Sequence, residues 1–252
     1  VQTICSVYYE FILDNNLFDS TLQIIMLFSF SLFRSDDSLL LTNANYFEQA
    51  LSKLCYSNEA VERTWSICTQ NYDSNEGKFF FVRAIAVSFA NAPDFYSEKL
   101  QQITELLKEG ILSNSSLLRD ASARTADEFV KFFVFESDEL SLTLVPIVVN
   151  ACRNNPSTEL LIVCSRLLYT TKKTDDFFDT SYPILMSYLD NGPPDIQSAS
   201  ISCLSSLARW STIKISVCFD SLLQKLKSIF DTETQTNKGS LIKKAGIVGS
   251  ST

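Results

Sequence analysis

The stretch that decides the fold is residues 182–207, which have the sequence YPILMSYLDNGPPDIQSASISCLSSL. The part before Asn191 has the pattern of an apolar helix, and Gly192-Pro193-Pro194 is a turn signal. A second helical pattern, rich in small residues, runs on to Leu207. Because the turn is short, the two predicted helices must pack antiparallel as a hairpin.

Fainter copies of this hairpin recur along the chain with a period of about 38 residues. Pro146 and Pro183 occupy equivalent places in two first helices, and Arg83 and Arg119 lie near the start of two second helices. Gln197 stands at the same place in the hairpin described above. The approximate repeat units are residues 18–57, 59–91, 98–135, 138–171, 175–210 and 213–252.

At these residues the chain resembles the HEAT and armadillo-type helical repeat family. The HEAT pattern has a Leu- and Pro-containing first helix, an Asp in the turn, and a second helix that opens with Val-Arg. Val82-Arg83, Leu118-Arg119 and Asp190 follow this pattern, whereas Gln197 departs from it. The resemblance is best over residues 175–210 and weakest over residues 1–57.

The repeats and the resemblance together predict an all-α fold, a right-handed α-solenoid (superhelix) of about six HEAT-like helical hairpins. We expect residues 1–252 to be one repeat segment, a fragment of a longer solenoid. In this family the arginine of the second helix often pairs with the turn aspartate of a neighbouring unit. The resemblance therefore implies a structural ladder that involves Arg83, Arg119 and Asp190.

Composition excludes several classes of protein. The 252 residues are 46% hydrophobic and 20% charged, with a formal net charge of −8, which argues against wholesale coating of nucleic acid. Binding of nucleic acid through a local basic face stays open. The most apolar run, Leu22–Phe33, is about half as long as a bilayer-crossing helix, so no membrane insertion is expected.

The sequence also carries no pattern of catalytic chemistry. It has no histidine, and its 7 cysteines lack the spacing of a metal or redox motif. The cysteines are therefore predicted to be buried and reduced, in a protein that is cytoplasmic and/or nuclear. Asp36-Asp37 and Asp175-Asp176 lie at predicted turns or helix starts. We expect a protein that is not an enzyme, with no catalytic residues, no metal ligands and no cofactors.

Charge gives the only indication of a binding face. First helices carry an excess of acids, whereas second helices carry an excess of bases. In HEAT-like solenoids the second helices line the concave side, so a mildly basic inner face is predicted. Its candidate partner-binding residues are Arg124, Arg166, Arg209, Lys243 and Lys244. The alternative is structural, because acids at helix starts are stabilised by the helix dipole and basic residues can form ion pairs within the solenoid.

The leading functional hypothesis is a non-enzymatic protein-binding scaffold. By its resemblance to long HEAT proteins, it would be a segment of a nuclear transport receptor of the importin/exportin (karyopherin) kind that binds cargo or a small GTPase. One alternative is a TOG-like module that binds tubulin and microtubules, although Trp65 and Trp210 lie within predicted helices rather than in the turns. Another is a scaffold or regulatory subunit of a large intracellular complex. The oligomeric state is not predicted.

Overall fold

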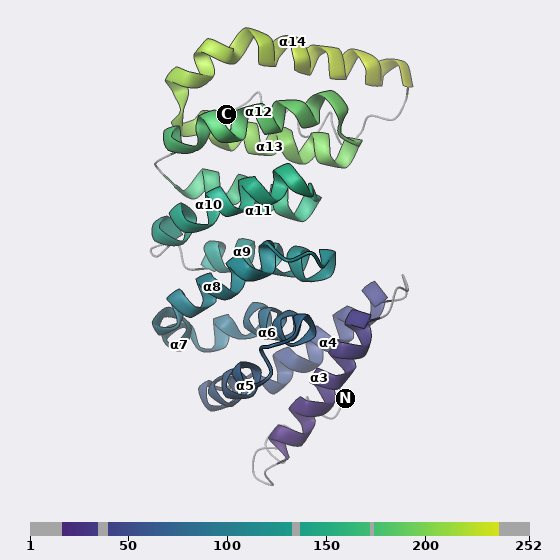
Figure 1. Ribbon diagram of the computed structural model, residues 1–252, viewed down its shortest axis with the longest axis vertical. Coiled ribbons are helices and arrows are strands. Elements are labelled where there is room, and N and C mark those ends of the chain that lie inside the picture. The colour runs from purple at the N-terminus through teal and green to yellow at the C-terminus, as the bar shows by residue number, and fades with distance from the viewer. Residues whose placement is uncertain (1–16, 35–39, 133–136, 172–173, 237–252) are drawn as a thin grey trace. The chain divides into compact units, whose positions relative to one another are not determined.

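The computed structural model describes residues 17–34, 40–132, 137–171 and 174–236 (Figure 1). All regular structure in these ranges is helical, which confirms the predicted all-α class. The chain divides into two compact units, Val1–Phe132 and Phe133–Thr252, and each is described by itself. The handedness of a solenoid, the number of repeats and the repeat boundaries stay predictions.

Unit 1 consists of antiparallel helical hairpins. Its helices are α3 (Phe18–Arg34), α4 (Leu40–Leu54), α5 (Asn58–Gln70), α6 (Asn75–Ser88), the short 3-10 helix η1 (Phe89–Asn91), α7 (Pro93–Glu98), α8 (Leu100–Ile111) and α9 (Ser116–Phe132). Helices adjacent in the chain pack as pairs, α3 with α4, α5 with α6 and α8 with α9. Helix α6 also packs against α4 and α9, so the second helices of successive hairpins lie against one another.

Local sequence explains where these helices begin. Ser57 precedes α5, and its hydroxyl accepts a hydrogen bond from the backbone N–H of Ala60 at 3.2 Å. Ser74 caps α6 in the same way through the N–H of Gly77 at 3.0 Å. Such caps satisfy N–H groups that have no partner within the helix. Each cap ends a short connection. The connection at Ser74 joins α5 to α6 within one hairpin, and that at Ser57 joins α4 to α5 of successive hairpins.

Helix α6 is the centre of the core of unit 1. Phe80 and Ile85 are fully buried, and Phe81 is nearly so. The rings of Phe47 on α4 and Phe80 lie 5.8 Å apart, a contact between two second helices. On the other side, the hydroxyl of Thr125 on α9 donates to the backbone carbonyl of Val82, 43 positions earlier. Helix α6 is thus covered on two sides by the hairpins before and after its own.

Unit 2 repeats this arrangement. Its helices are α10 (Ser137–Asn154), α11 (Thr158–Thr170), α12 (Asp175–Asn191), α13 (Pro194–Trp210) and α14 (Thr212–Thr236). Helices α10 and α11 form one hairpin and α12 and α13 the next, and α11 packs along α13. Pro146 and Pro183 lie inside α10 and α12, as the sequence indicates.

Small side chains bring α11 and α13 close together. The hydroxyls of Ser165 and Ser206 lie 2.9 Å apart, with a sequence separation of 41. The thiol of Cys203 donates to the carbonyl of Leu161 at 2.9 Å, with a separation of 42. Because a thiol or hydroxyl reaches the neighbouring backbone only over a short distance, these bonds require close helix packing. Contacts between successive hairpins therefore join residues about one predicted repeat apart.

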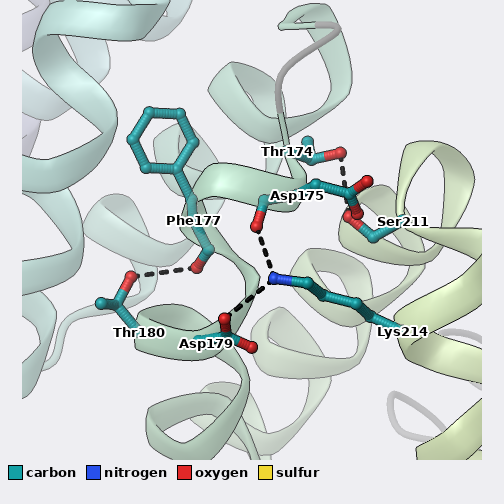
Figure 2. A network of polar contacts seen from close by, with 7 residues as sticks. All are labelled: Thr174, Asp175, Phe177, Asp179, Thr180, Ser211 and Lys214. Carbon is teal, nitrogen blue, oxygen red and sulfur yellow. Dashed lines mark hydrogen bonds and ion pairs between the residues drawn. The ribbon is translucent and has the colours of Figure 1, made fainter.

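The start of α14 is tied to the start of α12 by polar contacts (Figure 2). The buried hydroxyl of Ser211 donates to that of Thr174 at 3.1 Å. The ammonium group of Lys214 donates to the carbonyl of Asp175 and to the carboxylate of Asp179, both at 2.9 Å. The bond to Asp179 raises the pKa of Lys214 above its ordinary value. These contacts align α14 with the hairpin before it.

The sequence also predicts that no segment inserts into a membrane and that the cysteines are buried. Across the described ranges, no helix is both long enough and apolar enough to cross a bilayer. The thiols of Cys68, Cys152 and Cys203 are buried as predicted, and burial raises the pKa of each well above its ordinary value. Such thiols are poor nucleophiles because little thiolate is present near neutral pH. Cys218 is only half-buried, so the prediction of burial is wrong for this residue.

Gly77 provides a stability test of the α5–α6 hairpin. A Cβ atom at Gly77 would lie 1.7 Å from the backbone oxygen of Asn71, at the end of α5. Alanine gains about 1 kcal/mol in helix propensity over glycine. The clash must nevertheless displace backbone, so we expect Gly77→Ala to lower the free energy of unfolding by about 1–3 kcal/mol.

Urea denaturation followed by circular dichroism measures this change. Asn75→Ala is the matched control, because Asn75 is exposed in the same first turn of α6. The control should stay within about 0.5 kcal/mol of the wild type. A Gly77→Ala protein as stable as the wild type would show that the hairpins do not approach as closely as described.

Candidate functional site

The structure distributes the predicted partner-binding residues over both units. Arg124 is exposed on α9 in unit 1, whereas Arg166 on α11 and Arg209 on α13 belong to unit 2. Lys243 and Lys244 lie outside the described residues. The described residues therefore do not bring the five predicted residues onto one basic face. Among them, Arg209 has two aromatic side chains close to its guanidinium group.

The guanidinium group of Arg209 lies over two aromatic rings, and we name Tyr169, Arg209 and Trp210 the Arg209 cluster. The guanidinium carbon lies 4.3 Å from the centre of the Tyr169 ring and 5.3 Å from that of Trp210. Nη1 of Arg209 donates to the hydroxyl of Tyr169 at 2.7 Å. The indole N–H of Trp210 donates to the backbone carbonyl of Tyr169 at 3.0 Å. The cluster therefore joins the ends of α11 and α13.

The cluster is ordered and yet open to solvent. Tyr169 is 43% exposed and Trp210 is 41% exposed, and Arg209 is also exposed. Trp, Tyr and Arg are the residues most enriched among binding hot spots. Sequence reasoning identified Arg209 but missed its aromatic neighbours. Aligning the repeats would have found them, because Tyr169 and Trp210 are 41 positions apart, about one repeat.

The three predicted ladder residues each have a different kind of partner. Arg83 on α6 forms an ion pair with Glu48 on α4, and the Arg83 side chain is only 12% exposed. Arg119 instead donates to the carbonyl of Ser113 at 3.0 Å, in the turn of its own hairpin. Asp190 forms an ion pair with Lys225 on α14. Arg83 and Asp190 thus link successive hairpins, whereas this bond of Arg119 stays within one.

A groove on unit 1 is a second candidate site, and we name it the Trp65 groove. Helices α5, α6 and α8 and the turn between α5 and α6 line its volume of about 420 Å³. The lining residues are Trp65, Thr69, Tyr72, Phe81, Gln101, Gln102, Glu105 and Leu106. Trp65 packs edge-to-face against Phe81 at 4.7 Å and Phe95 at 5.6 Å between ring centres. Three of its eight lining side chains are aromatic, and two amides and one carboxylate lie among the others.

One wall of the groove is stabilised by a charged network. The carboxylate of Glu109 accepts hydrogen bonds from the hydroxyl of Tyr72 and the ammonium of Lys78, both at 2.6 Å. The bond from Lys78, followed by that from Tyr72, lowers the pKa of Glu109 below its ordinary value. Burial, together with the bond to Glu109, raises the pKa of Tyr72. This network fixes the orientation of the Tyr72 ring.

The side chains of the two sites bear on which ligands they could hold. In the part of the chain that the structure describes, no group of three or more Cys, Asp or Glu side chains could hold a metal ion. The Arg209 cluster offers a cation and aromatic surface, and the Trp65 groove offers aromatic surface and a carboxylate. Both arrangements are suited to recognition of another molecule.

The ion pair of Arg83 with Glu48 should contribute to stability. We expect Arg83→Met to lower the free energy of unfolding by about 1–3 kcal/mol, because it leaves the partly buried Glu48 unpaired. A double-mutant cycle with Glu48→Gln, measured by urea denaturation, should give a coupling energy of about 1 kcal/mol or more. The exposed pair Lys108–Glu105 on α8 is the control and should couple by at most about 0.5 kcal/mol. Equal coupling in both cycles would contradict a role for Arg83 in linking α6 to α4.

Glu109 should make stability depend on pH. Because its pKa is lowered by folding, its contribution is present above the ordinary value of 4.5 and is lost as the pH falls through the lower folded value. Glu109→Gln should therefore be less stable than the wild type at pH 7. Thermal denaturation from pH 7 to pH 3 should show this difference shrinking below about pH 4.5. A difference that stayed constant over this range would contradict the charge interaction with Lys78.

Comparison with known proteins does not assign the chain to a family. No family model matches the sequence, and no curated protein matches it. The HEAT-type resemblance thus stays a prediction.

Proposed function

We propose that this chain is a non-enzymatic scaffold that binds partner proteins on the faces of its helical hairpins. In this proposal the Arg209 cluster anchors an acidic segment of a partner. The observation that carries it is that Arg209 is held by Tyr169 and Trp210 and remains exposed.

The geometry of Arg209 favours a carboxylate ligand. A guanidinium group carries five N–H donors in a planar fork that matches a carboxylate. The bond to Tyr169 uses Nη1, so the edge formed by Nε and Nη2 is the one that suits a bidentate contact. The flanking rings restrict the side chain before binding, so less conformational entropy is lost when a partner binds.

The overall charge of the chain supports a protein ligand over nucleic acid. With a net charge of −8, the protein would repel a long phosphate backbone except at local basic groups. A short acidic segment needs only one or two cations and an apolar contact. Tyr169 and Trp210 provide that contact beside Arg209. Acidic peptide segments therefore fit the cluster better than DNA or RNA.

Two more specific functions follow from the HEAT-type resemblance alone. A nuclear transport receptor would bind a nuclear GTPase in its GTP form, or a cargo protein. A TOG-like module would co-sediment with tubulin. A subunit of a larger complex would show neither activity. The general scaffold proposal is compatible with each of them, and pull-down with the GTPase and co-sedimentation with tubulin separate them.

The proposal can be tested with the two tryptophans as reporters. The chain has 2 Trp residues, Trp65 in the groove and Trp210 in the Arg209 cluster. Protein containing 5-fluorotryptophan should give two ¹⁹F NMR resonances, which Trp65→Phe and Trp210→Phe assign. A capped peptide of alternating Glu and Gly should shift the Trp210 resonance saturably, since it binds beside that ring.

Arg209→Met should weaken this binding by about tenfold or more, which corresponds to about 1.4 kcal/mol. Arg209→Lys should also bind more weakly than the wild type, because lysine cannot form the planar fork. The control is Arg153→Met, which removes an exposed arginine from α10 and should bind as the wild type does. Equal loss in Arg153→Met, or unchanged binding in Arg209→Met, would contradict the proposed site.

A further inference from the structure

We propose that the Trp65 groove is a separate binding site for a lysine or arginine side chain carried by a partner protein. This inference concerns unit 1 and a ligand of the opposite charge, so it does not depend on the Arg209 cluster. It is argued from the rings, the carboxylate and the size of the groove.

The aromatic lining is suited to a cation. A lysine or arginine head group within about 6 Å of a ring centre is attracted by the negative face of the ring, and Trp is the strongest of the aromatic partners. The chain already uses rings here in this way. The ammonium of Lys78 lies 4.8 Å from the centre of the Tyr72 ring, which lines the groove. The ammonium of Lys99 lies 5.8 Å from the centre of the Phe95 ring, which packs against Trp65 outside the lining.

Glu105 supplies a negative charge to the groove. Its side chain is 57% exposed, and its carboxylate lies 3.3 Å from the ammonium of Lys108. An exposed pair of this kind contributes only about 0.2–1 kcal/mol, so an incoming cation can replace Lys108 at little cost. Glu109 is different, because Tyr72 and Lys78 both donate to its carboxylate. Glu105 is therefore the carboxylate that we assign to the ligand.

The size and polarity of the groove fit a long basic side chain. Its volume of about 420 Å³ lies within the range of roughly 300–1,000 Å³ that is usual for ligand pockets. The alkyl stem of lysine or arginine can pack on Trp65 and Phe81 while the charged end reaches Glu105. The amides of Gln101 and Gln102 can accept further N–H groups. An acidic ligand would be repelled by Glu105, and a purely apolar one would leave that carboxylate and the amides partly desolvated.

The test uses the intact protein with 5-fluorotryptophan and a set of capped peptides, Gly-Gly-X-Gly-Gly. With lysine or arginine at X, the Trp65 resonance should shift saturably and the Trp210 resonance should stay in place. Norleucine at X keeps the stem of lysine but removes its charge, and it should bind about tenfold more weakly. Trimethyllysine at X keeps the charge of lysine but loses its N–H donors, so its affinity reports the attraction of the charge to the rings. The trimethyllysine peptide should bind more tightly than the norleucine peptide.

Glu105→Gln should weaken binding of the lysine peptide about three- to tenfold without unfolding the protein, because the side chain is exposed. The matched control is Glu59→Gln. Glu59 is an exposed acid in the first turn of α5, in the same unit, and it does not line the groove. It should bind the peptide as the wild type does.

Several results would overturn the proposal. One is that the norleucine and lysine peptides bind with equal affinity. Another is that no cationic peptide shifts the Trp65 resonance. The third is that Glu105→Gln and the wild type bind the lysine peptide with equal affinity. The two proposals fail independently, because a failure at the groove appears in the Trp65 resonance and a failure at the Arg209 cluster in the Trp210 resonance.

Discussion

Within each unit, the burial of a second helix between neighbouring helices is the constraint on which the structure depends. Helix α11 shows it best, because it packs against α10 in its own hairpin and along α13 in the next. Leu160, Leu161 and Leu167 of α11 are fully buried as a result. Burying such a side chain contributes about 1.5–3 kcal/mol, and a single hairpin could cover only one side of the helix. Stability therefore comes from the contact between hairpins as much as from the hairpins themselves.

This packing also determines which side chains meet. Residues about one repeat apart lie side by side, as Ser165 and Ser206 do within unit 2 and Val82 and Thr125 do within unit 1. The Arg209 cluster follows the same rule, since Tyr169 and Arg209 are 40 positions apart. Because packed helices hold these positions, the cation is oriented before any ligand arrives. In the proposed scaffold function, recognition groups would therefore need no dedicated binding loop.

Much of the fold could be predicted from sequence, whereas most of the site could not. Residues 182–207 indicated a hairpin, and α12 and α13 occupy that stretch. The short helix α7 was missed, because Pro93 begins it without a side-chain cap. Arg209 was predicted on a second helix that lines a basic concave face. The neighbouring rings of Tyr169 and Trp210 could not be predicted, because they depend on which residues of α11 and α13 face each other. The Trp65 groove was also missed, because its lining residues come from three helices and the turn between two of them. Predicting it would require knowing which side of each helix faces the others.

The central claim is that successive hairpins within a unit stabilise one another, and hydrogen exchange of the whole chain tests it most directly. Leu167→Ala removes a fully buried side chain from α11 and should cost about 2–5 kcal/mol of local stability. The account predicts that amide exchange, measured by mass spectrometry, accelerates most in α10, α11 and α13 and stays near its wild-type rate in α5 and α6. Equal acceleration along the entire chain would contradict the claim.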